Sequence, residues 1–354
     1  MKFGLHYQLP CSANQSPVQR YRDTLDQAVY AEALGFDSVW PVEQHFNANL
    51  SIMPSPLLML AALAERTRTL RLGIAIVLLP LSHPLRVAEE IATLDVISNG
   101  RVEFGIGRGA VPNHFRAFGV PIAENRDRFV EGLEVILQAW TSDRVSHHGR
   151  FYEIERIAVV PKPVQQPHPP IRVAANSEDT FDLTGRMGLP IFVASQVNPF
   201  HRIKRFLPIY HEARKAAGHP DCAAEDVTVL MPLYVGESAA QVRREVEPSI
   251  KHFLGTVTSL YGSGTPRLGA TRSDAAASLK ESLERLSRMT YEQVCERMAV
   301  FDTPEACVER LQRFRQDFNM GRVICWFNPG GQVPHRQVMR SMEMFAAKVM
   351  PHFE

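Results

Sequence analysis

A carboxylate, an amide and an imidazole stand side by side where an apolar segment ends. Residues 39–46 read VWPVEQHF, so Glu43, Gln44 and His45 follow a run that has the composition of a β-strand. An imidazole can exchange a proton near neutral pH, whereas an amide only donates and accepts hydrogen bonds. His6 ends a second apolar run near the N-terminus. If these strand ends meet, the sequence predicts a site that combines proton transfer with hydrogen bonding to a substrate.

A glycine-rich segment offers a second kind of chemistry. FGIGRG at residues 104–109 ends another predicted strand, and we expect Arg108 to project into the mouth of the site. The glycines stand two residues apart, which does not match the spacing of a dinucleotide-binding turn. We therefore expect a strand end whose glycines leave room for a flat ligand. A glycine-rich turn with a surface arginine is the alternative.

The segment AANSEDT at residues 174–180 could bind an anion together with that arginine. It stands where a predicted strand gives way to a helix, and Asn176 or Ser177 suits the N-cap position. Free backbone N–H groups at the start of a helix attract phosphate. Glu178 and Asp179 suit the helix dipole but would repel a phosphate unless their side chains point away. Helix capping alone is the alternative explanation of this pattern.

Several motifs that indicate other chemistry are absent from the sequence. It has no HxH or HExxH pair for a metal, no GxSxG turn for a serine nucleophile, and no CxxC pair among its five cysteines. The 39 Lys and Arg residues nearly balance the 38 Asp and Glu residues, without a basic block, which argues against nucleic acids and membrane surfaces. The N-terminus lacks a secretory signal pattern. We therefore expect a cytoplasmic protein that binds a small molecule and no metal.

The elements that must position these groups alternate along the 354 residues. Apolar strand candidates are separated by segments of helical period, such as PSPLLMLAALAERT and HPLRVAEEIATLDVI. Strands that alternate with amphipathic helices pair in parallel, and eight of them suit a closed (β/α)8 TIM barrel, whose active sites lie where the strands end. The strand candidates are residues 2–6, 37–44, 71–79, 101–105, 171–175, 190–195, 227–235 and 322–327.

The length of the chain predicts one domain with insertions. A barrel core needs about 250 residues, so roughly 100 of residues 1–354 belong to insertions. We expect the first at about residues 143–170, after the fourth βα unit, as a small β-excursion with a proline-rich return. We expect the second at about residues 255–300, after the seventh βα unit. It begins with a loop rich in Gly, Ser and Thr that is typical of a lid.

Six segments together resemble the bacterial luciferase-like monooxygenases. They are MKFG, GFDSVWPVEQHF, LGIAIVLLPLSHPLRVAEE, GRVEFGIGRG, NSEDT and the closing VMPHF, in the same order almost from end to end. The resemblance implies a TIM barrel that binds FMN where the strands end. The flavin arrives reduced from a separate NAD(P)H-dependent reductase and reacts with O2 to give a C4a-peroxy or hydroperoxy adduct. That adduct oxygenates a small organic substrate, such as an aldehyde, a ketone or an aromatic compound.

The resemblance also implies roles for single residues and for a dimer. Arg108, Ser177 and Thr180 match positions that hold the phosphate, and Ala75 and Ile76 match a strand bulge, often with a cis peptide, that supports the flavin ring. The family pairs its subunits through the helices predicted after the second and third strands, so we expect a homodimer. The complete cofactor site that we predict is Val42, Ala75, Ile76, Arg108, Asn176, Ser177, Thr180 and Gln196.

Two positions depart from the light-emitting luciferases, which have a catalytic histidine in place of Gln44 and a reactive cysteine in place of Gly107. These differences argue against light emission. We expect His6 to be the acid/base, Gln44 to position the oxygen adduct, and His45 to complete the catalytic group from the opposite face of the strand or to lie at an interface. His114, on the loop after the fourth strand, is the alternative imidazole, but a loop is held less rigidly than a strand end.

The sequence therefore predicts a two-component, FMN-dependent monooxygenase. Two other functions stay open. A deazaflavin-dependent oxidoreductase of the same fold would transfer hydride and need no oxygen. An accessory subunit would bind FMN without turnover and stabilise a partner barrel.

Overall fold

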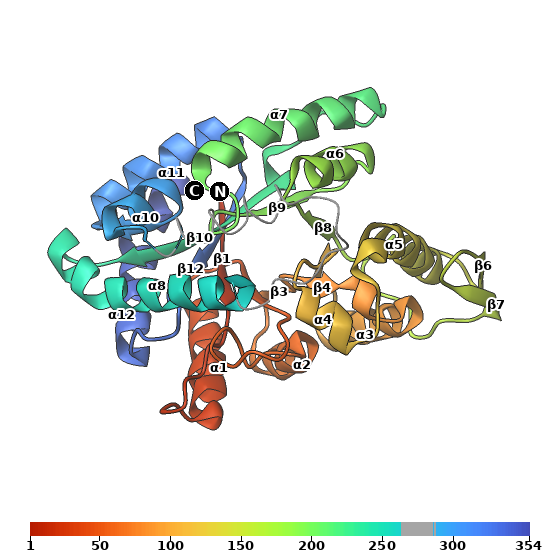
Figure 1. Ribbon diagram of the computed structural model, residues 1–354, viewed down its shortest axis with the longest axis horizontal. Helices are drawn as coiled ribbons and strands as arrows, with labels where there is room; N and C mark the ends of the chain where they lie inside the picture. The colour runs from red at the N-terminus through yellow and green to blue at the C-terminus, as the bar shows by residue number, and fades with distance from the viewer. Residues whose placement is uncertain (263–285, 287) are drawn as a thin grey trace.

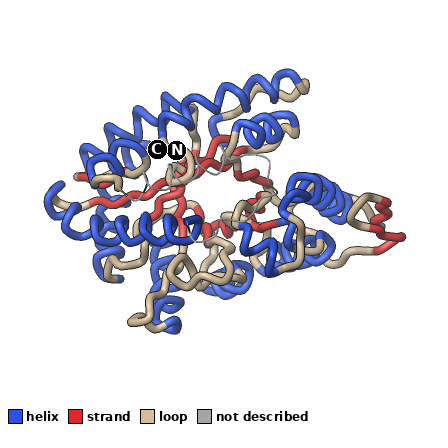
Figure 2. The backbone as a smooth tube through the Cα atoms, viewed as in Figure 1, coloured by secondary structure: helices blue, strands red, loops and turns tan. Residues whose placement is uncertain are grey.

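Eight parallel strands close into a barrel in the computed structural model, which describes residues 1–262, 286 and 288–354. The ring closes because β9 pairs with β10 and β12 pairs with β1. Figure 2 shows the strands around the middle of the molecule and the helices outside them. The predicted (β/α)8 fold is therefore confirmed. The barrel strands are β1 (Lys2–Tyr7), β2 (Ser38–Pro41), β3 (Arg71–Gly73), β5 (Val102–Gly107), β8 (Ile171–Ala174), β9 (Ile191–Ala194), β10 (Val227–Val235) and β12 (Arg322–Trp326).

The helices begin where the sequence favours a helix start. Proline stands in the first turn of α1, α2, α3, α4 and α11, where its fixed φ fits and its missing N–H breaks no hydrogen bond. Most of these helices pack their apolar faces on the barrel strands. The helices are α1 (Pro17–Ala33), α2 (Pro56–Arg66), α3 (Pro84–Ile97), α4 (Pro112–Ala117), α5 (Asn125–Thr141), α6 (Glu178–Arg186), α7 (Phe200–Ala216), α8 (Ala239–Gly262), α10 (Tyr291–Arg297), α11 (Pro304–Phe318) and α12 (His335–Lys348).

A buried cluster of charges closes the amino-terminal end of the barrel. Glu103 on β5 accepts hydrogen bonds from Arg71 (2.7 Å), Arg172 (2.9 Å) and Arg322 (2.5 Å). Burial by itself would raise the pKa of Glu103, but the charges of Arg322 and Arg172 outweigh it and lower the pKa to about 2. Since this end is sealed, the carboxyl ends of the strands remain as the place for a site.

The middle of the barrel is filled by Trp40, whose side chain is completely buried. A Cβ atom added at Gly105 would lie 1.9 Å from the carbonyl oxygen of Ile74, and one added at Gly107 would lie 2.0 Å from the side chain of Ile76. The prediction that the glycine-rich segment leaves room for a flat ligand is therefore wrong at these two positions. Ile74 and Ile76 occupy that space instead.

The third predicted strand is interrupted. Residues 71–79 form β3 and the short β4 (Val77–Leu78), which are joined by a bulge. The peptide bond between Ala75 and Ile76 within this bulge is cis, as the resemblance implied. The bulge is anchored to the second strand, because the backbone N–H of Ala75 donates to the carbonyl oxygen of Pro41 (3.0 Å).

Three other strand boundaries differ from the prediction. β2 ends at Pro41, which has no N–H to extend the ladder, so Gln44 lies in the following loop rather than in the strand. β5 continues to Gly107, two residues beyond its predicted end. β11 (Val300–Asp302) was not predicted, and it pairs with the outer end of β10. The polar residues predicted at the ends of the second and fourth strands therefore lie in the loops that follow these strands.

Residues 143–170 contain an antiparallel hairpin of β6 (Val145–His148) and β7 (Glu153–Ile157). In Figure 1 this hairpin projects from the barrel beyond the end of α5. The return segment contains two cis prolines, Pro161 and Pro167. The predicted β-excursion and proline-rich return are thus confirmed, whereas the status of this segment as an insertion stays a prediction.

The predicted loop after the seventh strand is helical at residues 255–262. α8 includes residues 255–262, so a loop was the wrong prediction there. The hydroxyls of Thr256 and Thr258 donate to carbonyl oxygens four residues earlier, at 3.0 and 2.8 Å, so these residues are satisfied inside a helix. Most of the predicted lid falls on residues 263–285 and 287, which lie outside the described residues.

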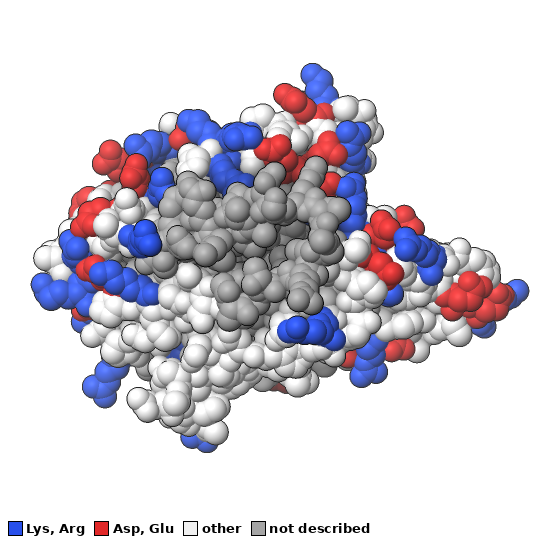
Figure 3. Space-filling view, in the orientation of Figure 1, with Lys and Arg blue, Asp and Glu red and all other residues white. Residues whose placement is uncertain are grey.

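The described residues contain no metal-binding cluster, no disulfide and no membrane-spanning helix. Acidic and basic side chains are interspersed on the described part of the face in Figure 3. No described group of three or more His, Cys, Asp or Glu residues could hold a metal ion. The five cysteines, all within the described residues, are free thiols. No helix in that part of the chain has the length and apolar character needed to cross a membrane.

Candidate active site

His6 lies inside the barrel at the carboxyl end of β1. Phe3 on the same strand packs against the outer helix α12, and because side chains alternate, Gly4 and His6 face the interior. The Nδ1 atom of His6 lies 2.9 Å from the carbonyl oxygen of Trp40 on the neighbouring strand. The ring also meets the ring of Trp326 edge to face at 5.4 Å. The position predicted for His6 is therefore that of a rigidly held group.

The surroundings of His6 keep its ring neutral. Burial lowers the pKa of His6 to about 4, and the bond to Trp40 opposes this only in part. A carbonyl oxygen can only accept, so Nδ1 carries the proton. Nε2 then keeps its lone pair and forms no hydrogen bond with the described residues. His6 can therefore accept a proton or a hydrogen bond from a molecule inside the barrel.

Gln44 reaches a second imidazole that comes from a different part of the chain. Its backbone N–H donates to the carbonyl oxygen of Met53 (2.9 Å), and this hydrogen bond fixes the loop after β2. Its side-chain Nε2 lies 3.1 Å from Nε2 of His114 on α4, and both side chains are buried. His114 Nε2 also lies 3.1 Å from the carbonyl oxygen of His45. Burial, with a smaller contribution from His45, lowers the pKa of His114 to about 4.

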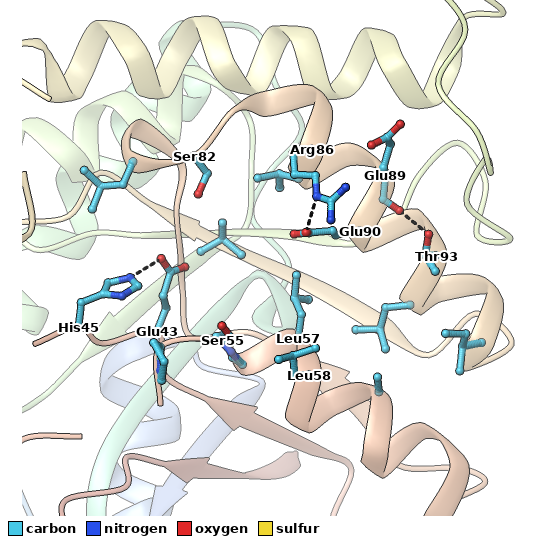
Figure 4. A pocket seen from close by; sticks show the side chains of 18 of the residues that line it. Glu43, His45, Ser55, Leu57, Leu58, Ser82, Arg86, Glu89, Glu90 and Thr93 are labelled. Carbon is cyan, nitrogen blue, oxygen red and sulfur yellow. Dashed lines mark hydrogen bonds and ion pairs between the residues drawn. The ribbon is translucent and has the colours of Figure 1, made fainter. Parts of the chain in front are cut away.

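The side chain of His45 does not bond to Gln44, but its ring packs edge to face against the ring of His114 (centroids 5.3 Å apart). Its Nε2 lies 3.0 Å from Oε1 of Glu43, whose other oxygen accepts a hydrogen bond from the backbone of Leu78 on β4 (3.1 Å). Glu43 and His45 line a groove of about 740 Å³ between α2 and α3, on the helix side of the barrel (Figure 4). His45 thus contributes its backbone carbonyl and an edge-to-face ring contact with His114 to the group around Gln44.

The flavin-ring residues predicted from the resemblance lie next to these groups. Val42 follows directly after β2, and its N–H donates to the carbonyl oxygen of Tyr7 (3.0 Å). Ala75 and Ile76 form the bulge between β3 and β4. Gln196 follows β9, where its side-chain oxygen is buried without a partner among the described residues. The structure therefore brings these predicted residues together at the carboxyl ends of the strands.

The predicted anion site forms at the start of α6. Ser177 is the N-cap, and its hydroxyl lies 2.7 Å from that of Thr180 in a reciprocal capping box. Arg108, which follows β5, donates from Nη2 to the Thr180 hydroxyl (3.3 Å). Asn176 is exposed immediately before the cap. The two segments that the sequence analysis joined are therefore in contact, and their arginine and hydroxyls could hold a phosphate.

Two charged residues at this site were not assigned from the sequence. Asp179 accepts a hydrogen bond from Arg108 Nη1 (2.8 Å) and contacts Arg126 at the start of α5. Glu178, by contrast, points to Arg205 on α7 (2.7 Å). The sequence analysis required both acidic side chains to point away from a bound phosphate. Glu178 does so, and Asp179 does not. A second arginine could have been expected because a phosphate dianion needs more than one cation, but no pattern in the sequence identifies Arg126.

Two buried polar atoms near the carboxyl ends of the strands have no partner among the described residues. Nε1 of Trp326, at the end of β12, is buried with no partner in the described part of the chain, like the oxygen of Gln196. Buried donors and acceptors are rarely left without a partner. A flavin ring carries N–H and C=O groups that could pair with them, and Arg108 with the start of α6 could hold its phosphate. The residues present therefore fit FMN.

Comparisons with known proteins show which proteins this chain is similar to. The family model described as luciferase-like monooxygenase matches residues 1–318. The oxygenase component of the flavin-dependent trigonelline monooxygenase from Acinetobacter baylyi is 31% identical over 67% of this chain and 66% of the relative. The crystal structure of monooxygenase RslO1 from Streptomyces bottropensis is 28% identical, covers 100% of both chains and has a TM-score of 0.84.

A second solved structure shows the fold alone, because its sequence identity is 20%. It is the oxygenating constituent of 3,6-diketocamphane monooxygenase from Pseudomonas putida, a type II Baeyer–Villiger monooxygenase, in complex with FMN. Its TM-score is 0.82, and the match covers 99% of this chain and 98% of that chain.

Proposed function

Because this chain belongs to the luciferase-like monooxygenase family, we propose that it is the oxygenase component of a two-component system, which uses reduced FMN and O2 to oxygenate a small organic substrate. The observation that carries the proposal is the contact of Arg108 with Thr180 in the capping box of α6, at the end of the barrel where buried polar atoms lack partners. Aldehydes, ketones and aromatic compounds are the substrate classes to test.

The FMN phosphate is proposed to bind at Arg108, Ser177 and Thr180, with backbone N–H groups of α6 as further donors. The flavin ring is proposed to lie against the bulge at Ala75 and Ile76. Its other contacts would include Val42, Asn176 and Gln196. When bound in its reduced form, FMN reacts with O2 and supplies the oxygen atom that is inserted into the substrate. The protein's own part is to hold the ring, the oxygen and the proton donors in place.

His6 is the proposed acid/base. Its ring is neutral at pH 7, Nδ1 is fixed by Trp40, and the free Nε2 can accept a proton and return it. Gln44 is proposed to donate a hydrogen bond to the reacting oxygen. His114 supports this role, because its contact with Gln44 limits rotation of the amide. His45 completes the group through its backbone carbonyl.

A separate NAD(P)H-dependent reductase is the proposed source of reduced FMN. The similarity to an oxygenase component of a flavin-dependent monooxygenase supports this partner. Reduced FMN must pass from one protein to the other before oxygen consumes it, so both proteins have to work in a compartment that contains NAD(P)H. We therefore place the reaction in the cytoplasm.

A homodimer through α2 and α3 is also part of the proposal. The groove between these helices is bordered by exposed apolar side chains, among them Leu58 (75% exposed) and Val160 (69% exposed). In Figure 4, Leu57 and Leu58 lie on one side of the groove and Arg86 and Glu90 on the other. Exposed apolar groups of this kind mark protein contacts. Sedimentation velocity at several protein concentrations should show a dimer, and a monomer at all concentrations would exclude this contact.

The function is tested by adding reduced FMN without oxygen and then admitting O2. We expect the protein to bind reduced FMN, to change its rate of reoxidation, and to transfer one atom of ¹⁸O2 to a carbonyl or aromatic compound while the other leaves as water. Hydride transfer from a reduced deazaflavin without oxygen would instead support the dehydrogenase alternative. Binding of FMN without oxidation of any compound in the screen would support an accessory subunit.

A further inference from the structure

Asp179 occupies the groups that a phosphate would need. Its carboxylate accepts a hydrogen bond from Arg108 (2.8 Å) and contacts Arg126, so it joins the chain after β5 to the start of α5. It stands in the first turn of α6, directly before Thr180 of the capping box. Any anion that binds this helix start must therefore share both guanidinium groups with Asp179 or displace it.

The ion pairs of Asp179 are weak enough to exchange. The side chain of Asp179 is 46% exposed and that of Arg108 is 19% exposed, and pairs in contact with water contribute little net energy. A phosphate dianion has more charge and more acceptor oxygens than a carboxylate. The phosphate can therefore replace the carboxylate at the arginines, but Asp179 then remains beside it as a like charge without a partner.

We propose that Asp179 is a built-in competitor of the FMN phosphate that weakens flavin binding. This role rests on the proposed function. An oxygenase that receives reduced FMN from another protein must release oxidised FMN in every cycle. Asp179 favours that release, because it returns to Arg108 and Arg126 when the phosphate leaves.

The opposite role is that Asp179 holds the two arginines in position for the phosphate. The two roles give opposite results for Asp179→Asn, which keeps the shape of the side chain and removes its charge. If Asp179 competes, the variant binds FMN more tightly. If Asp179 organises the arginines, the variant binds FMN more weakly.

The test compares the dissociation constants of FMN and riboflavin, measured by the quenching of flavin fluorescence. We expect Asp179→Asn to bind FMN about three- to tenfold more tightly, because the phosphate then neither displaces a carboxylate from two arginines nor binds beside a like charge. Riboflavin has no phosphate, so its dissociation constant should stay the same. The rate constant for FMN release, from stopped-flow displacement, should fall by a similar factor.

Glu178→Gln is the matched control. It removes the same charge from the same helical turn, but Glu178 points to Arg205 and away from the site. We expect its dissociation constant for FMN to stay within about twofold of wild type, because the side chain of Glu178 is 55% exposed and its charge is offset by Arg205 and screened by salt. Circular dichroism on both variants checks that the protein remains folded.

Each other result overturns a distinct statement. Unchanged or weaker FMN binding by Asp179→Asn, with wild-type riboflavin binding, excludes the competitor role and leaves the phosphate site intact. If Glu178→Gln tightens FMN binding as much as Asp179→Asn does, the effect comes from the net charge of the helix start. That result also excludes the competitor role. If the wild-type protein binds FMN no better than riboflavin, the phosphate assignment of the proposed function is wrong, and the role of Asp179 fails with it.

Discussion

Arg108→Ala should weaken FMN binding and leave riboflavin binding unchanged. In the structure, Arg108 donates to Thr180 and to Asp179, and its side chain is largely buried at the start of α6. A charge-assisted hydrogen bond to the phosphate would contribute about 1.5–3 kcal/mol. Breaking the pair with Asp179 costs about 0–1 kcal/mol because that carboxylate is half exposed. The net loss of about 0.5–3 kcal/mol predicts a dissociation constant raised by about 2- to 150-fold.

The assay is fluorescence quenching of FMN and of riboflavin by the Arg108→Ala protein at constant ionic strength. Salt must be held fixed, since it screens exposed charges. Arg205→Ala is the control, because it removes an exposed arginine that bonds to Glu178 in the same helical turn. FMN affinity that is unchanged in Arg108→Ala, or reduced equally in Arg205→Ala, would refute the assignment of the phosphate to this arginine.

Three further results are expected. His6→Ala should slow substrate oxygenation by about 10²–10⁴-fold in single-turnover experiments with little change in FMN affinity; an equal loss of flavin binding would contradict the acid/base role. Leu58→Asp should give monomers in sedimentation velocity, because it adds a charge to the exposed groove. Glu103 has a folded pKa of about 2, below its ordinary 4.5, so it stabilises the protein above pH 4.5 and less as the pH falls toward 2; Glu103→Gln should lower Tm at pH 7 and flatten its change between pH 5 and 3.

The sequence predicted the barrel because the alternation of strand and helix patterns is a property of neighbouring residues. It also predicted that His6 and Gln44 stand near the ends of two strands, since strand ends are visible as changes from apolar to polar residues. It could not predict the partner of Gln44. His114 is 70 residues away along the chain, and only the closed barrel brings the two side chains to 3.1 Å.

Local rules failed where distant contacts decide the structure. Gly105 and Gly107 suggested space for a ligand, but that space belongs to Ile74 and Ile76 of the neighbouring strand region. The Thr residues of α8 suggested a loop, but their hydroxyls bond within the helix. The direction of Asp179 depends on Arg126, whose position is set by how α5 packs. None of these contacts has a signal in a short segment of sequence.

The alternation at the end of the second strand restricts how this segment can vary. Gln44 contacts His114 toward the barrel mouth, while Glu43 and His45 bond to each other on the helix side. Glu43 also accepts a hydrogen bond from the backbone N–H of Leu78 on β4. The backbone carbonyl of His45 contacts His114, the imidazole that Gln44 also contacts. An exchange of His45 therefore affects both sides, because its ring bonds to Glu43 on the helix side and packs against the ring of His114 toward the barrel mouth. Libraries designed to change the substrate should leave this tripeptide intact and diversify other loops at the barrel mouth.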